Sequence, residues 1–327
     1  MRILAAPDKF RGTASAPAVA AAVAAAGRAA GARTDEVPLS DGGEGFLDVF
    51  GGANRTTTVT GPLGAPVEAG WRLAGRFAVI EMARASGLAL VGGPEGNDPI
   101  AASTIGTGEL IAAAVDAGAR RVFVGHGGSA TTDGGLAALR ALSPAARLRG
   151  VELVAAVDVH TAFLDAAEVF GPQKGATPNQ VALLTRRLER LAQVYLDDHG
   201  IDVTELDGAG AAGGLAGGLA TVGASILSGF DLIADELDLA AAVEQADLVV
   251  TGEGFVDEAS FQGKVVGGIA ALAAEYGVPV LVVAGEVFDG VDDRVPAVSL
   301  VREFGRERAL GDTLACITEV VAAHLAG

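Results

Sequence analysis

The sequence is poor in cysteine and histidine, which limits the kinds of site that it can form. Only Cys316 among the 327 residues is a cysteine, so no disulfide can form within the chain. With one cysteine and four histidines, the composition does not favour a structural zinc site. Cys316 lies in an apolar stretch, and we interpret it as a buried helix residue.

Positive charge is also scarce. The chain has 41 acidic residues against 23 lysines and arginines, for a formal net charge of −18. A surface this negative repels phosphate backbones and anionic lipids, which argues against nucleic-acid binding and against attachment to a membrane surface. A small anionic ligand would need a locally positive pocket or a bridging cation.

Long apolar runs are missing. The longest uncharged apolar run, 18–26, is far too short to span a bilayer. The apolar N-terminus is interrupted by Pro7, Asp8 and Lys9 and makes a poor signal peptide, so we expect a cytoplasmic protein. Apolar residues make up 50% and charged residues 20% of the chain, which is typical of a folded protein, and its length suggests two domains. The oligomeric state stays open, a homo-oligomer included.

Lysine is rare in a way that points to function. Only Lys9, Lys174 and Lys264 are lysines, so 20 of the 23 basic residues are arginine. Each of the three lies in a segment punctuated by glycine or proline. A compact ammonium and a planar guanidinium are not interchangeable. We interpret these three positions as ones where a compact positive charge binds a phosphate or a carboxylate. The alternative is that they are surface lysines that remain by chance.

Strand and helix patterns alternate at both ends of the chain, which predicts a parallel α/β sheet. The expected strands are 2–6, 121–125, 151–157, 247–250 and 278–284, and the expected helices are 15–28, 107–117, 136–142 and 308–325. Residues 56–82 have instead the pattern of a β-meander, and we expect a second domain to begin there.

A further helix is predicted after the capping box Thr177-Pro178-Asn179-Gln180. Its leucines recur on one stripe, with Arg186, Arg187 and Arg190 outside that stripe. We interpret these arginines as a solvated face rather than a site.

Four acidic residues each follow a predicted buried strand within a few positions: Asp8, Asp41, Asp158 and Glu253. In doubly wound sheets the ligand crevice lies at the carboxyl ends of the strands. Mg²⁺ prefers carboxylate oxygens and water, and it would offset the repulsion between this acidic protein and a nucleotide. The alternative is that these acids only cap the helices that follow.

The segment from Gly125 to Gly135 is the best phosphate-binding candidate. Its glycines allow close approach of the backbone, Ser129, Thr131 and Thr132 add hydroxyls, and a helix N-terminus is expected to follow. The alternative is a simple tight turn between a strand and a helix.

Other phosphate and nucleophile motifs are missing or weak. Gly208, Gly210 and Gly213 match the dinucleotide pattern Gly-x-Gly-x-x-Gly, but no convincing strand precedes them, and close helix packing or a loop next to a nucleotide is the better interpretation. There is no Gly-x-x-x-x-Gly-Lys-Ser/Thr, which excludes an ordinary P-loop, and no Gly-x-Ser-x-Gly.

Taken together, the motifs resemble the first class of glycerate kinases. The matching segments are 6–12 (Ala-Pro-Asp-Lys-Phe-Arg-Gly), 41–45 (Asp-Gly-Gly-Glu-Gly), 60–64, 103–109, 127–135, 170–176 (Phe-Gly-Pro-Gln-Lys-Gly-Ala), 208–214 and 251–254 (Thr-Gly-Glu-Gly). They run in the family's order from residue 1 to about residue 290, so the resemblance covers nearly the whole chain.

This resemblance implies ATP-dependent phosphorylation of D-glycerate to 2-phosphoglycerate. It also implies two α/β lobes, which fits the change of pattern near residue 60. We expect a Rossmann-like parallel-sheet lobe built from both chain ends, 1–60 plus 240–327, and an inserted lobe with a flavodoxin-like core, 61–239. The alternatives are a kinase for another small hydroxy acid and a non-catalytic nucleotide-binding relative of the family; an oxidoreductase is a distant third.

Phosphoryl transfer needs positioning and charge neutralisation, and the candidate residues are assigned on that basis. We expect ATP phosphates near Gly127, Gly128, Ser129, Thr131 and Thr132. We expect Mg²⁺ near Asp41, Glu44 and Glu253, as direct or outer ligands. Asp158 or Asp8 would accept the proton of the glycerate hydroxyl. Lys9, Lys174 and Lys264 are candidates to hold the substrate carboxylate or to stabilise the transferred phosphoryl group, with Lys9 counted as catalytic and Lys174, Lys264 and Arg84 as substrate-binding.

The sequence departs from the family at three places. The stretch 140–150 is shorter than usual, so we expect a peripheral element of the inserted lobe to be missing. Asp158 is followed by Val159-His160-Thr161, where the family tends to have Asn-Pro-Leu. Lys9 is followed by Arg11, where the family often has Ser and Lys. The second departure leaves the exact hydroxy acid open.

Overall fold

The computed structural model describes residues 1–261, 264–288 and 295–327. The chain forms two compact units, one discontinuous (Met1–Asp41 with Phe230–Gly327) and one inserted (Gly42–Gly229). These boundaries differ from the expected 60/61 and 239/240. Strand β3 (Arg55–Thr60) pairs with β4 (Pro66–Ala74) and therefore belongs to the inserted unit. Helix α9 (Gly229–Glu236) belongs almost wholly to the terminal unit.

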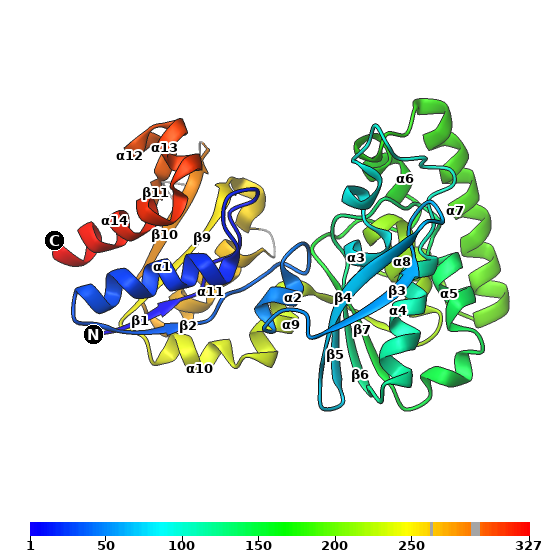
Figure 1. Cartoon of the computed structure of the whole chain (residues 1–327), viewed down its shortest axis with the longest axis horizontal. Coiled ribbons are helices and arrows are strands. Elements are labelled where there is room, and N and C mark those ends of the chain that lie inside the picture. Colours follow the sequence, from blue (N-terminus) through cyan, green and yellow to red (C-terminus); the bar gives the residue numbers. More distant parts are fainter. Residues whose placement is uncertain (262–263, 289–294) are drawn as a thin grey trace. The chain divides into compact units, whose positions relative to one another are not determined.

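The terminal unit is a five-stranded parallel sheet in the order β11-β10-β9-β1-β2 (Figure 1). The strands are β1 (Arg2–Ala5), β2 (Arg33–Glu36), β9 (Leu248–Val256), β10 (Val280–Val287) and β11 (Ala297–Ser299). Numbered within this unit, the order is 2-1-3-4-5, the doubly wound order of flavodoxin-like folds. The strand order therefore reverses between β1 and β9.

Helices cover both faces of this sheet. Helix α1 (Ala16–Ala29) begins where the Ser15 side chain accepts from the backbone N–H of Ala18, and it packs in one core with α14 (Thr313–Ala326). Helix α11 (Val265–Tyr276) contributes to a separate core with β9 and β10. The other helices of the unit are α10 (Leu239–Glu244), α12 (Leu300–Phe304) and α13 (Arg306–Gly311). The single helix expected over 308–325 is two helices, because the backbone of Asp312 is not helical.

The inserted unit has a six-stranded sheet in sequential order, β3-β4-β5-β6-β7-β8. Its remaining strands are β5 (Phe77–Glu81), β6 (Arg121–Gly125), β7 (Glu152–Val157) and β8 (Ser225–Ser228). The pairs β3–β4 and β4–β5 are antiparallel, as expected of a meander, and β5 to β8 are parallel. The flavodoxin-like order expected here lies in the terminal unit instead. Since β4 already occupies one edge of β5, the chain adds its later strands on the other edge only.

The two faces of the second sheet have different cores. Helices α4 (Ile105–Asp116), α5 (Leu136–Leu142) and α8 (Ala211–Ala220) cover one face with aliphatic residues. On the other face, next to α2 (Phe46–Val49), Phe46, Phe50, Phe77 and Phe123 make edge-to-face contacts. Helix α7 (Pro178–His199) begins with the predicted capping box and shares a smaller core with α6 (Ala166–Phe170). Among the described residues, no helix has the length and apolarity that crossing a membrane requires.

Candidate active site

The terminal unit gathers three of the predicted acids where its strand order reverses. Asp8 follows β1, and its backbone N–H donates to the carbonyl of Gly252 on β9 at 2.9 Å. Glu253 is the next residue on β9, and Asp41 lies on the segment that continues from β2 past Leu39, whose N–H donates to Pro7. In doubly wound sheets this reversal point is the place where ligands bind.

One ammonium lies among these carboxylates. The Lys9 Nζ atom is 3.6 Å from Asp8 Oδ1 and 3.7 Å from Asp41 Oδ1. Burial, with the charge of Asp41 as a second cause, raises the pKa of Asp8 to about 7, against the opposing effect of Lys9. Burial also raises the pKa of Glu253, while Ser260 and Lys264 act in the opposite direction. The positive charges of Lys9 and Lys264 therefore do not outweigh the effect of burial on these carboxylates.

The chemistry of this group fits a divalent cation. Glu253 Oε1 is buried and has no hydrogen-bond partner in the described part of the chain. Carboxylate oxygens are the ligands that Mg²⁺ prefers, and in phosphoryl-transfer enzymes one or two carboxylates suffice because phosphates and water complete the shell. Among the described residues, no group of three or more His, Cys, Asp or Glu side chains is placed to hold a metal ion.

The inserted unit supplies the predicted glycine-rich loop, 126–135, directly after β6. Its carbonyls are held from inside the unit by three side chains. Lys174 Nζ donates to Thr131 O at 2.7 Å, Tyr195 Oη donates to Gly134 O at 2.9 Å, and Asn97 Nδ2 donates to Ala130 O at 3.0 Å. These donors fix the backbone of the loop without covering the part of it that is exposed.

Asp133 holds the same loop from within. Its Oδ2 accepts from the backbone N–H and the hydroxyl of Thr104, both at 2.9 Å, and its Oδ1 accepts from the N–H of Gly135 at 3.1 Å. Burial raises the pKa of Asp133, and the Thr104 hydrogen bonds oppose that shift. Asp133 is thus fully engaged in holding the turn.

Close backbone packing explains the glycines of two motifs. A Cβ on Gly127 would lie 2.5 Å from the Cα of Gly43, and one on Gly213 would lie 2.0 Å from Thr131 O. Both distances are far below van der Waals contact, so only glycine fits. Gly210 and Gly213 thus allow close packing next to α8, which is one of the two alternatives to a dinucleotide site.

Comparison with known proteins places the chain in a family. A sequence model described as "Glycerate kinase family" matches residues 3–146 and 143–304. A protein of Bacillus subtilis named "Glycerate kinase" is 39% identical over 88% of this chain and 85% of its own length. A protein of Escherichia coli named "Glycerate 2-kinase" is 37% identical over 89% of this chain and 87% of its own length. The crystal structure of a putative glycerate kinase 2 from Salmonella typhimurium LT2 superposes with a TM-score of 0.84, at 34% identity, over 100% of this chain and 97% of that one.

The chain belongs to the glycerate kinase family. The family expected from the motifs is thereby confirmed, together with the two-lobe α/β architecture and the kinase class. The family model matches in two pieces that overlap at 143–146. These residues lie in the stretch 140–150, where the sequence predicted a shortened element, and the stretch contains a short 3₁₀ turn, Ala145–Leu148.

The predicted site residues of this glycerate kinase family member divide between the two units. Asp8, Lys9, Asp41, Glu253 and Lys264 lie in the terminal unit, and Lys264 stands directly before α11. The other predicted residues all lie in the inserted unit: Glu44, Arg84, Gly127, Gly128, Ser129, Thr131, Thr132, Asp158 and Lys174. The metal set of Asp41, Glu44 and Glu253 is thus divided between the two units, and Glu44 is exposed.

The hydroxyls of the loop are less accessible than the sequence suggested. Ser129, Thr131 and Thr132 are all buried, and the Thr131 hydroxyl donates to Ala212 O. Gly127 is half-buried and Gly128 is exposed, so the accessible surface of the loop is mainly backbone. The helix that follows, α5, has only seven residues, so its N-terminus adds little to anion binding.

Lys174 and Arg84 have contrasting surroundings. Lys174 is 2% exposed and lies behind the loop, so its ammonium contacts the loop and not the solvent. Arg84, on α3 (Ala83–Ser86), is anchored through its Nε atom to Glu81 at 2.9 Å, while its side chain stays 41% exposed. The segment after α3 runs beside the loop, since Leu88 N–H donates to Gly128 O. Arg84 is therefore paired with Glu81 and at the same time partly exposed.

His126 is a residue whose surroundings the sequence did not reveal. It follows β6 and is 3% exposed, with Nδ1 at 2.8 Å from Val124 O. Its Nε2 atom is buried without a partner in the described part of the chain. Burial lowers the pKa of His126 to about 4, so the imidazole is neutral at pH 7, with Nδ1 as the donor. The adjoining glycines were the only sequence signal for this position.

Proposed function

We propose that the protein transfers the terminal phosphoryl group of ATP to the C2 hydroxyl of D-glycerate, giving 2-phosphoglycerate and ADP. The bond between the β–γ bridging oxygen and the γ-phosphorus breaks, the bond between the hydroxyl oxygen and that phosphorus forms, and the hydroxyl proton passes to a protein carboxylate. The family membership and the relative named "Glycerate 2-kinase" support this choice of reaction and position.

The observation that carries the proposal is the acidic group at the strand reversal of the terminal unit. We assign Asp8 as the group that accepts the hydroxyl proton, because it is buried at the switch point with Lys9 3.6 Å away. Asp158, the alternative, follows β7 in the inserted unit and is half-buried. A base next to a fixed ammonium is well suited, since the ammonium also balances charge on the transferred group.

Asp41 and Glu253 are the residues that would hold Mg²⁺. The metal, when bound with the nucleotide, neutralises charge on the phosphate oxygens. The orphaned Oε1 of Glu253 supports this assignment, whereas the exposed Glu44 has no such feature. The charge of Lys264 lowers the pKa of Glu253, against the effect of burial, so Lys264 is close enough to contribute positive charge at this site.

The glycine-rich loop of the inserted unit is proposed to bind the phosphates through the backbone of half-buried Gly127 and exposed Gly128. Arg84 is proposed to hold the carboxylate of the acceptor beside it. Lys174 is assigned as a positioning residue, because it donates to Thr131 O from behind the loop. The Lys174 ammonium thus stabilises the loop backbone and does not contact the substrate.

A panel of small hydroxy acids in an ADP-release assay tests the reaction. D-Glycerate is expected to give the highest kcat/KM, and another acid in first place would favour the related-kinase alternative. Proton-coupled phosphorus NMR of the product fixes the position: phosphate on C2 couples to one methine proton and gives a doublet, whereas phosphate on C3 gives a triplet. ATP binding without ADP release for any acid would favour a non-catalytic relative.

A further inference from the structure

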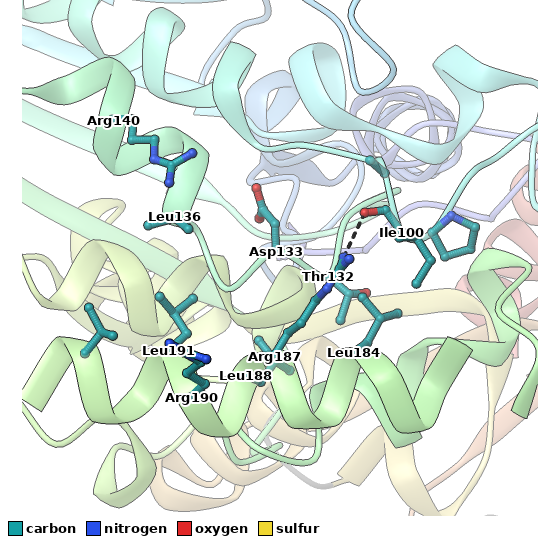
Figure 2. Close-up of a pocket in the computed structure, with 13 residues that line it drawn as sticks. Ile100, Thr132, Asp133, Leu136, Arg140, Leu184, Arg187, Leu188, Arg190 and Leu191 are labelled. Carbon is teal, nitrogen blue, oxygen red and sulfur yellow. Dashed lines mark hydrogen bonds between the residues drawn. The ribbon is translucent and has the colours of Figure 1, made fainter. Parts of the chain in front are cut away.

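The inserted unit contains a cavity that the proposed reaction does not use. It has a volume of about 520 Å³ and lies between α5, α7 and the segment 99–102 (Figure 2). Volumes of this size are typical of sites for small organic ligands. All the residues that line it belong to the inserted unit, so the cavity is complete within one compact body.

The floor of the cavity is apolar. Leu136 on α5 and Leu184, Leu188 and Leu191 on α7 line it, and Ile100 closes one end (Figure 2). Leu184 and Leu188 are also part of the core between α6 and α7. A wall that belongs to a packed core keeps its shape when the cavity is empty, so an apolar body can enter without reorganising it.

Guanidinium groups surround this floor. Arg140 comes from α5, and Arg187 and Arg190 come from α7, on the opposite side of the cavity (Figure 2). Arg187 donates to Ile100 O at 3.1 Å. Within the ranges that the structure covers, none of the three forms an ion pair, although the chain has 41 acidic residues. Asp133, the acid in the wall, accepts from Thr104 and Gly135 instead.

We propose that this cavity binds a small organic anion with an apolar body. The carboxylate, sulfonate or phosphate of such a ligand would lie at Arg140 and Arg190, and its hydrocarbon part would cover the leucines. In a chain with a net charge of −18, unpaired arginines on both sides of an apolar cavity select anions. D-Glycerate does not suit this site, because each of its three carbons carries oxygen and no apolar part is left to bury.

The cavity also reaches the glycine-rich loop. Thr132 and Asp133 belong both to the loop and to the cavity wall. Thr132 Oγ1 is buried without a hydrogen-bond partner in the described part of the chain, so this end of the loop keeps polar capacity that its own unit does not use. A ligand in the cavity therefore contacts the segment whose other end is exposed at Gly128.

Anilinonaphthalene sulfonate, an aromatic anion, is a direct probe of this site in the intact protein. Its fluorescence titration is expected to show one saturable site, and Arg140→Gln and Arg190→Gln are each expected to weaken binding about tenfold, the worth of one charge-assisted hydrogen bond. N-Phenylnaphthylamine has the same ring frame without the anion, and its weaker binding is expected not to change in either variant. Arg186→Gln is the matched control, because Arg186 lies on α7 beside Arg187 but does not line the cavity.

Three results would overturn the proposal. Equal binding of the sulfonate probe by the parent, Arg140→Gln and Arg190→Gln would show that these arginines do not bind its anionic group. An equal loss in Arg186→Gln would reduce the effect to general charge. Displacement of the probe by MgATP at the concentrations that saturate the enzyme would assign the cavity to the nucleotide. Because all arms measure binding, they stand even if the proposed phosphoryl transfer fails its own test, and thermal melting of each variant confirms that it is folded.

Discussion

The ammonium of Lys174 lies 2.7 Å from the carbonyl oxygen of Thr131, inside the inserted unit and out of contact with solvent. Burial lowers the pKa of Lys174 to about 7, although the charge of Asp133 acts in the opposite direction. An ammonium kept here at neutral pH carries a desolvation cost, which the hydrogen bond to the loop partly offsets. Holding one carbonyl of the glycine-rich loop with this ammonium therefore lowers the free energy of unfolding.

The pH dependence of stability tests the burial of Lys174. In the unfolded chain the lysine keeps its ordinary pKa of 10.5, so between about pH 7 and pH 10.5 the unfolded state binds more protons than the folded state. The free energy of unfolding should therefore rise with pH in this window, by up to about 1.4 kcal/mol per pH unit from this group. Urea unfolding at several pH values should show a shallower rise for Lys174→Met than for the parent. Parallel curves for the two proteins would contradict the assignment.

Asp8→Asn tests the proton acceptor. The amide keeps the size of the side chain but accepts no proton, so kcat should fall by about 10²- to 10⁴-fold. Stability at pH 8 should hold or increase, because the variant removes a buried carboxylate whose pKa lies near 7. Asp35→Asn is the control in the same unit, since Asp35 pairs with Arg2 and the expected kcat is within about twofold of the parent. Near-normal turnover in Asp8→Asn would contradict this assignment and favour Asp158 as the proton acceptor.

Local sequence patterns predicted the elements of the fold well. The meander over 56–82, the strand 121–125 and the capping box at Thr177 all occur as predicted, because each depends on residues close together in the chain. The strand order was harder to predict. It depends on which strand edge is already paired, and β4 covers one edge of β5 in a way that spacing does not reveal.

Which side chains of the glycine-rich loop face inward could not be predicted from the sequence. It placed Thr131 and Thr132 at a phosphate site and Lys174 at the substrate, but all three are buried. Whether a loop side chain faces inward depends on what packs behind it, here Asn97 and Tyr195, from distant parts of the chain. The ends of parallel strands meet at one edge of a sheet, and this rule grouped Asp8, Asp41 and Glu253, but Asp158, predicted with them, lies in the other unit.

Glu253→Gln tests the proposed metal ligand. The neutral amide is a weaker ligand for a hard cation, so the Mg²⁺ concentration that gives half-maximal activity should rise about tenfold or more. Glu44→Gln is the matched control, because Glu44 is exposed and belongs to the inserted unit. The measurement is a Mg²⁺ titration of initial rate at saturating substrates. An equal shift in both variants, or a shift in Glu44→Gln alone, would contradict the assignment of Glu253.

Gly127→Ala tests the close approach at the loop. The new methyl group would lie 2.5 Å from the Cα of Gly43, so backbone must move, at a cost of about 1–3 kcal/mol in stability. The KM for ATP should rise as the exposed backbone shifts. Gly311→Ala serves as the control, because no atom lies within 4 Å of the added carbon. Steady-state kinetics and urea unfolding measure both effects, and a silent Gly127→Ala would remove this loop from phosphate binding.

The neutral imidazole of His126 makes the protein sensitive to acid. Its pKa is about 4 in the folded state, against 6.5 for an unperturbed histidine, so between these values the unfolded chain binds more protons. The stability from this group is complete above about pH 6.5 and is lost as the pH falls toward 4, by up to about 1.4 kcal/mol per pH unit.

In His126→Asn the amide nitrogen can still donate to Val124 O, as Nδ1 does, but it does not titrate. The parent should therefore lose more stability than the variant between pH 6.5 and 4.5 in urea unfolding. His324→Asn is the control for replacing an exposed histidine, near the end of α14. Equal slopes in the parent and His126→Asn would show that His126 is protonated without cost.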